Sequence, residues 1–100
     1  MNVLKIVNGK LELRTDRGIL VRVISSSGVV DGDINRDGDL VLVTLSNGKV
    51  ELRKDNGILA RVIVTSNALS ARFSGDDIAI RLSNGKTELR KQNGILIRSF

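Results

Sequence analysis

The chain has 100 residues, enough for one small domain, and 41% of them are hydrophobic, which excludes a disordered chain. It has no Cys and no His, which excludes structural zinc of the usual kinds, thiol catalysis and nucleophiles activated by an imidazole base. The net charge of +5 permits attraction to polyanions, but two aromatic residues are too few for a stacking platform. We expect a soluble domain that is not an enzyme.

No stretch is long and apolar enough to cross a membrane, because the longest apolar blocks are Leu40–Val43 and Ile19–Val21. We therefore expect no membrane partner. The first ten residues lack the charged, apolar and small-residue progression of a signal peptide. Cytoplasmic residence is the default expectation, and the sequence leaves the localisation unknown.

One phrase occurs three times, at Asn8–Ile24, Asn47–Ile63 and Asn84–Phe100. The repeat period is 39 residues between Gly9 and Gly48 and 37 residues between Gly48 and Gly85. A period of this length is typical of a four-stranded propeller blade, and the alternating apolar residues favour strands over helical repeats. We expect one repeat domain over residues 1–100, with repeats at about 1–25, 26–64 and 65–100.

The first repeat begins with a predicted hairpin. Residues 2–7 form one strand, Asn8-Gly9 the turn and residues 11–14 the returning strand. Asn-Gly is typical of a type I′ turn, because both central positions need positive φ. This turn predicts pairing of Ile6 with Leu11, Lys5 with Glu12 and Leu4 with Leu13.

The same count applied to the other two repeats predicts their registers. It pairs Leu45 with Val50 and Val43 with Leu52 in the second repeat. In the third it pairs Arg81 with Glu88 and Ile80 with Leu89. Apolar residues then meet apolar residues, and opposite charges meet across the strands.

A second turn leads into the strands GILVRVI, GILARVI and GILIRSF. They are apolar on both faces, so we expect both faces to be covered by neighbouring blades. Each contains one arginine: Arg22, Arg61 or Arg98. We expect these arginines to lie between blades and to pair with the glutamates of the same or an adjacent blade, Glu12, Glu51 and Glu88.

Polar connections at 25–28 and 66–67 precede a further strand in the second and third repeats, at 29–34 and 68–73. Each of these strands enters a Gly/Asp loop, at 35–39 or 74–77. With the strands of a blade labelled A to D, the chain runs B-C-D, A-B-C-D, A-B-C-D. We therefore expect eleven strands, with the first A strand missing.

The stretch FSGDDIAIRLSNGKTELRKQNGILIRSF, residues 73–100, resembles the repeats of the β-propeller superfamily, both WD-type and quinoprotein-type. It lacks the Trp-Asp and Gly-His signatures of the first and the tryptophan docking motif of the second. The resemblance implies an all-β fold of four-stranded antiparallel blades, with an incomplete propeller in each chain. A β-trefoil, which also contains three four-stranded repeats, is the alternative.

The middle repeat, VVDGDINRDGDLVLVTLSNGKVEL, resembles the integrin-type FG-GAP repeats, which bind calcium in the loop between strands A and B. The resemblance and the alternate oxygen-bearing side chains give a candidate metal site at Asp33, Asn35, Asp37 and Asp39. Val41 and Thr44 stand where further carboxylate ligands would be expected. Tight turns also recruit Asp, Asn and Gly, so a plain turn without a cofactor is the other interpretation.

Basic residues recur at equivalent positions and would form a ring: Lys10, Lys49, Lys86, Arg53, Lys54, Arg90 and Lys91. The repeats are somewhat similar to those of the gyrase C-terminal domain, which binds DNA through a basic perimeter. Polyanion or nucleic-acid binding is therefore the alternative function. A solvated rim that keeps the protein soluble is the other interpretation of these residues.

The blade count predicts the assembly. Eleven strands make just under three blades, whereas closed propellers have at least four. We expect a non-enzymatic structural or binding module that closes its propeller by homo-oligomerisation, as a dimer or, alternatively, a trimer. The sequence names no ligand.

Overall fold

The computed structural model describes all 100 residues and contains eleven strands. Their bounds are β1 Val3–Val7, β2 Lys10–Arg14, β3 Leu20–Ser25, β4 Val29–Ile34, β5 Leu40–Leu45, β6 Val50–Lys54, β7 Leu59–Val64, β8 Ala68–Ser74, β9 Asp77–Leu82, β10 Thr87–Arg90 and β11 Leu96–Ser99. None of its segments is a helix that could cross a membrane.

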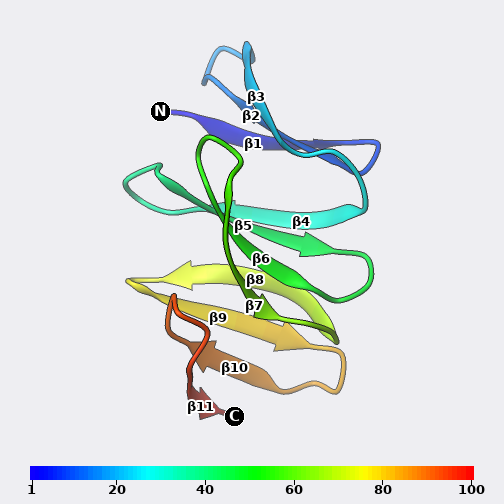
Figure 1. Ribbon diagram of the computed structural model, residues 1–100, viewed down its shortest axis with the longest axis vertical. Coiled ribbons are helices and arrows are strands. Elements are labelled where there is room, and N and C mark those ends of the chain that lie inside the picture. The colour runs from blue at the N-terminus through cyan, green and yellow to red at the C-terminus, as the bar shows by residue number, and fades with distance from the viewer.

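The strands form three antiparallel sheets, each made of strands consecutive in sequence. The first blade has the order β1-β2-β3, the second β4-β5-β6-β7 and the third β8-β9-β10-β11. The blades stack along the 38 Å long axis (Figure 1). Separate stacked sheets confirm the predicted blades and the missing first A strand, and they show that the trefoil alternative is wrong.

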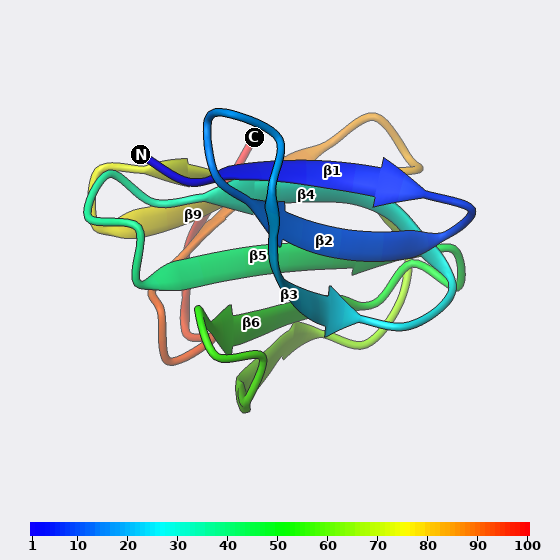
Figure 2. The same cartoon turned by 90° about the horizontal axis from the view of Figure 1, so that it is seen from above.

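The stack is closest at its inner edge. There β4 contacts β1 of the first blade and β8 of the third, while β3, β7 and β11 lie at the opposite edge of each sheet. Figure 2 shows β1 and β4 on one side of the molecule and β3 on the other. Small residues permit the close approach at the inner edge, since a Cβ on Gly32 would lie 3.1 Å from a methyl group of Leu11.

Two apolar clusters fill the spaces between blades. The cluster between the first and second blades consists of Leu11, Leu13, Ile24, Val29, Val41 and Val43. The cluster between the second and third consists of Leu42, Val50, Leu52, Ile63, Ala68, Ala71, Ile78 and Ile80. Alternation along β5 directs Val41 and Val43 to one neighbour and Leu42 to the other, so the middle blade is buried on both faces.

The predicted register is confirmed only in the first hairpin, where Ile6 pairs with Leu11 and Lys5 with Glu12. The other two predictions are wrong by one residue. Leu42, not Val43, pairs with Leu52. In the third blade Ile80, not Arg81, pairs with Glu88, and Leu89 pairs with Ala79.

The residue before each Asn-Gly explains the difference. Val7 is β-branched, prefers the extended conformation and leaves a two-residue turn in which Asn8 and Gly9 both have positive φ. Ser46 and Ser83 stand at that position in the other repeats, and serine readily enters a turn. The loop then has three residues, and the Asn47 side chain accepts a hydrogen bond from the Lys49 N–H (3.0 Å).

The sequence predicted that both faces of the outermost strands would be covered by neighbouring blades. This prediction is wrong. Most residues of β3, β7 and β11 are exposed, and only Ile24 and Ile63 among them are buried. The reason is topological, because each of these strands lies at the free edge of its sheet. Their apolar side chains therefore form part of the molecular surface.

Candidate functional site

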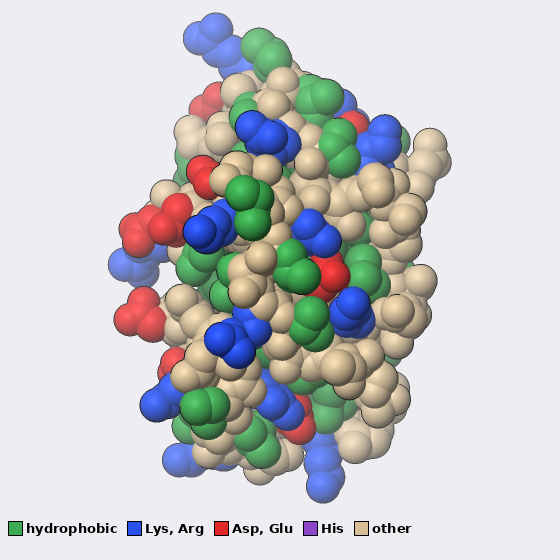
Figure 3. All heavy atoms as spheres, viewed as in Figure 1, with side chains coloured by type: hydrophobic (Ala, Val, Ile, Leu, Met, Phe, Trp, Pro, Cys, Tyr) green, Lys and Arg blue, Asp and Glu red, His purple; other side chains and the backbone are tan.

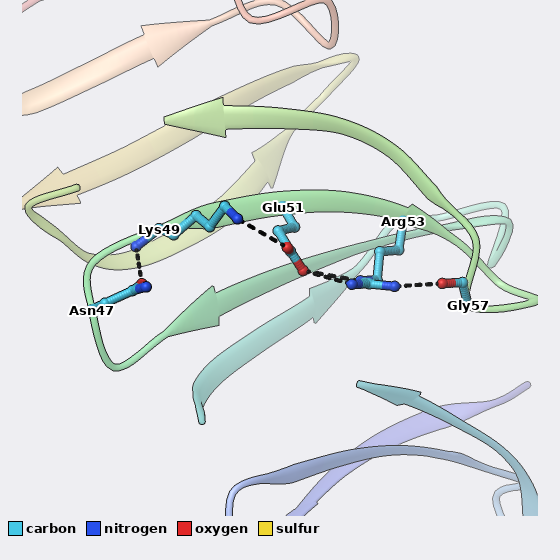
Figure 4. A network of polar contacts seen from close by, with 5 residues as sticks. All are labelled: Asn47, Lys49, Glu51, Arg53 and Gly57. Atoms are coloured by element: carbon cyan, nitrogen blue, oxygen red, sulfur yellow. Dashed lines mark hydrogen bonds and ion pairs between the residues drawn. The ribbon is translucent and has the colours of Figure 1, made fainter. Parts of the chain in front are cut away.

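A polar network recurs in all three blades and holds the turn between the last two strands. In the second blade the Arg53 Nε–H donates to Glu51 Oε1 (3.0 Å) and Nη1–H donates to the Gly57 carbonyl (2.7 Å). Lys49 Nζ lies 3.7 Å from the other carboxylate oxygen (Figure 4). Arg14 and Arg90 make the equivalent bonds to Glu12 and Glu88.

These bonds correct the predicted partners of the glutamates. Each Glu pairs with the arginine two residues later on its own strand, which lies on the same face of the sheet. Arg22, Arg61 and Arg98 form no ion pair. These three carboxylates therefore stabilise individual blades and do not link one blade to the next.

Arg22 and Arg61 lie between blades, as the sequence predicted. A Cβ on Gly57 of the second blade would lie 3.9 Å from Arg22 Cδ, and one on Gly94 of the third would lie 3.7 Å from Arg61 Cδ. The arginine stems thus pack on the turn glycine of the following blade. At the two ends of the stack this contact is incomplete. Arg98 belongs to the last blade, which has no following turn glycine to pack on. Gly18 is the turn glycine of the first blade, and nothing lies within 4 Å of a Cβ built on it.

A backbone hydrogen bond also joins successive blades. The Gly9 carbonyl accepts from the Val29 N–H (2.9 Å), and the Gly48 carbonyl accepts from the Ala68 N–H (3.0 Å). Gly48 must be glycine, because a Cβ there would lie 2.4 Å from the Asn67 nitrogen. The equivalent Gly85 carbonyl has no such partner, so the third blade ends with an unused docking group.

The two end faces of the stack are less apolar than the faces between blades. On the first blade Lys5 and Glu12 are cross-strand partners that face outward, because their neighbours Leu4, Leu11 and Leu13 face the second blade. On the third blade the outward residues are Ala79, Arg81, Thr87 and Leu89. The internal faces of the middle blade carry larger or more apolar residues at these positions. Val43 is equivalent to Lys5, Leu42 to Ala79 and Val50 to Thr87.

The candidate calcium residues lie beside a cleft of about 550 Å³ between the second and third blades. Asp33, Asn35 and Asp37 line it together with Phe73 and Asp76, whereas Asp39 does not. No three acidic side chains gather closely enough to hold a metal ion. The calcium hypothesis stays a prediction.

Local hydrogen bonds use the oxygens of this loop. The Asn35 Oδ1 accepts from the N–H groups of Asp39 (3.0 Å) and Leu40 (3.1 Å), and its amide donates to Asp39 Oδ1 (2.7 Å). Asp33 Oδ2 accepts from the Phe73 N–H of the next blade (2.8 Å). The bonds of Asn35 stabilise a tight turn, and the bond of Asp33 joins the second blade to the third.

An ion pair between inner strands was not predicted. The Arg72 guanidinium of β8 donates to both carboxylate oxygens of Asp31 in β4. Hydrogen bonding to Asp31 raises the pKa of Arg72 above its ordinary value. The repeat alignment could not reveal this pair, because Asp31 and Arg72 occupy different positions of their own strands.

The structure places the predicted basic ring in two different environments. Arg53 and Arg90 are held by Glu51 and Glu88 and by turn carbonyls, so they are not free for a polyanion. Lys54, Lys86 and Lys91 are exposed, while Lys10 and Lys49 are half-buried.

Comparison with protein-family models and with curated proteins gives no match. Among solved structures, the chain is similar to BamB from Moraxella catarrhalis, with a TM-score of 0.80 and 14% identity over 99% of this chain and 32% of that one. It is also similar to Sqt1 from Saccharomyces cerevisiae, with a TM-score of 0.72 and 16% identity over 92% and 27% of the two chains.

The C-terminal WD40 domain of Sif2 matches with a TM-score of 0.70 and 16% identity over 90% of this chain and 28% of that one. The chain thus spans about a third or less of the structures it resembles. The fold of the chain is that of the β-propeller repeat proteins, as an incomplete propeller.

Proposed function

We propose that the protein is a non-enzymatic binding scaffold whose copies join head to tail to close a propeller. The observation that carries this proposal is the pair of unmatched halves of one repeated contact. Arg98 stands in the last blade at the repeat position where Arg22 and Arg61 pack on a following turn. Gly18 begins the stack with an open turn. Such head-to-tail contacts are heterologous, and they close only as a ring.

The two end faces are partly polar. The first blade exposes Lys5, while its Glu12 is buried and held by Arg14. The third blade presents Arg81 beside Leu89. Because the ends are partly polar, we expect reversible association of folded chains rather than an obligate oligomer.

Two copies supply six sheets, which is within the usual range of propellers, so the dimer is the proposed state. A trimer would supply nine. In either ring the place of the first A strand beside β1 stays vacant at each junction. The chain spans only about a third of each similar structure, which supports the need for further blades.

Light scattering after size exclusion tests the association. We expect a mass of about twice the 10.9 kDa chain at high protein concentration and dissociation on dilution. Arg98→Glu is expected to shift the equilibrium to the monomer. Lys54→Glu makes the same charge change on the middle blade and serves as the matched control. A parent chain that stays monomeric at millimolar concentration would refute the proposal.

Polyanion binding through the rim is the second candidate, supported by the net charge of +5 and the exposed Lys54, Lys86 and Lys91. Retention on heparin should then fall steeply with salt. Lys86→Gln should reduce it, because Lys86 is free of intramolecular pairs. Elution at the same low salt for both chains would contradict this function.

A further inference from the structure

Each blade presents the same two apolar side chains at the start of its outermost strand. The isoleucines Ile19, Ile58 and Ile95 are 63%, 58% and 58% exposed. The leucines that follow them are Leu20, Leu59 and Leu96, at 47%, 44% and 46%. We call these six residues the outer stripe. The exposed fractions are nearly equal in the three blades, so these side chains occupy equivalent positions in each repeat.

The backbone holds the outer stripe in place. Thr15, Lys54 and Lys91 each donate a backbone N–H to the carbonyl of the stripe isoleucine, at 2.8, 2.9 and 2.9 Å. In the second and third blades the asparagine side chain of the turn also accepts from the isoleucine N–H, at 3.0 Å in both. A partner would therefore meet a surface that is already ordered, which reduces the entropic cost of binding.

The outer stripe runs along the stack. Figure 1 shows β3, β7 and β11 one below the other along the 38 Å long axis. A partner strand paired with one sheet edge would touch one blade only, whereas a helix laid along the stack would contact all three pairs. At a rise of about 1.5 Å per residue, a helix of about 25 residues spans this length.

The outer stripe is embedded in positive charge. The three segments 15–23, 54–62 and 91–99 contain six basic residues and two acidic ones, which gives +4 of the chain's +5. The basic residues are Arg17, Arg22, Lys54, Arg61, Lys91 and Arg98. Figure 3 shows hydrophobic and basic side chains mingled down this face. Its complement is a surface with an apolar centre and acidic flanks.

We propose that the outer stripe is a docking surface for an acidic amphipathic helix of a partner protein. The apolar face of the helix would cover the three Ile-Leu pairs, and its carboxylates would face the arginines and lysines around them. This surface lies on the outer edge of the blades. Of its parts, ring closure would engage only Arg98 and the Gly18 turn beside Ile19, so the stripe of the middle blade stays available whether or not copies of the chain associate.

A designed peptide tests the surface. The probe is a fluorescently labelled 25-residue helix, about the length of the stack, with leucines on one face and glutamates on its flanks. We expect saturable binding to the full chain by fluorescence anisotropy. Ile58→Asp should weaken it about tenfold or more, by losing apolar contact and repelling the glutamates. Leu69→Asp is the matched control, because Leu69 is 53% exposed on the inner strand β8.

A second peptide of the same composition, with its leucines spread around the helix, should bind at least tenfold more weakly. Equal binding of the two peptides, or equal effects of Ile58→Asp and Leu69→Asp, would overturn the proposal. Flotation with anionic phosphatidylserine vesicles covers the other class of partner. If the chain binds the vesicles but not the peptide, and Ile58→Asp abolishes vesicle binding, the outer stripe is a membrane-binding surface. This result would also overturn the proposal of a helical partner. Peptide binding by a chain that stays monomeric would separate this proposal from ring closure.

Discussion

The spaces between blades and the two ends of the stack are built from the same repeat, yet they differ in character. Between blades, Val43 and Ile80 face the preceding sheet and are fully buried. At the first end, Lys5 holds the equivalent position and faces solvent. Stacked repeats need terminal units with a polar outer face. The first end face has Lys5 where the internal face has Val43. The last end face has Ala79, Arg81 and Thr87 where the internal face has Leu42, Thr44 and Val50.

Turn length produces part of this difference. The two-residue turn of the first hairpin places Leu4 and Ile6 on the face of Leu11 and Leu13, and it directs Lys5 outward. A three-residue turn would turn Lys5 toward the core, because a shift of one residue exchanges the two faces of a strand. The register is therefore selected by burial as well as by the turn residues.

The largest effect is expected from a charge placed between blades. Ile80→Asp puts a carboxylate in a fully buried position directly opposite Glu88, a like charge, and should destabilise the protein by about 4 kcal/mol or more, enough to unfold it. Thr87→Asp on the third end face should leave the melting temperature nearly unchanged. Circular dichroism during heating measures both, and similar losses in the two variants would contradict the contrast between internal and end faces.

The buried polar network should contribute less than the apolar core. Arg53→Ala leaves the buried Glu51 carboxylate with only the distant Lys49 as partner, and we expect a loss of about 2 kcal/mol in unfolding free energy. Lys54→Ala, on the same strand and without a partner, is the control. Urea denaturation followed by far-ultraviolet circular dichroism measures the difference. An equal effect of the two substitutions would show that the network is not stabilising.

One buried hydroxyl between the second and third blades is unsatisfied. Thr44 Oγ1 has no hydrogen-bond partner, and the residue is 1% exposed. Thr44→Val keeps the shape and removes the buried polar atom, so it should raise the unfolding free energy by about 1 kcal/mol. Arg81→Val at the equivalent position of the end face should give no such gain. A lower urea midpoint for Thr44→Val would contradict the assignment.

The smallest effect is expected in the loop at 35–39. Asn35→Ala removes three local hydrogen bonds at an exposed turn and should cost about 0.5 kcal/mol in unfolding free energy.

If this loop binds calcium, millimolar calcium will raise the melting temperature of the parent chain, and Asp37→Ala will abolish that rise. Identical melting curves with calcium and with a chelator would exclude the calcium hypothesis.

Much of the fold could be predicted from the sequence. The threefold phrase and its Asn-Gly turns predicted eleven strands, their order and the missing first strand, because turn chemistry is local. The registers of the second and third hairpins could not be predicted by the same count, because Ser46 and Ser83 lengthen the turns by one residue.

The sequence predicted fewer features of the candidate sites than of the fold. Alternation along a strand does not distinguish an apolar residue between blades, such as Ile63, from one at a free sheet edge, such as Ile58. The Asp31–Arg72 pair depends on how two inner strands are offset, which no local pattern specifies. The Arg22 and Arg61 contacts were expected between blades, but their glycine partners come from the geometry of the next turn.

The burial of the middle blade on both faces bears on how such a gene could grow. One face of β5 matches the blade before it, and the other face matches the blade after it. A tandem duplication of the segment around residues 26–64 would therefore insert a blade whose two faces meet compatible neighbours. Such a duplication leaves Lys5 at one end and Thr87 at the other, so the array can lengthen by recombination without evolving new termini.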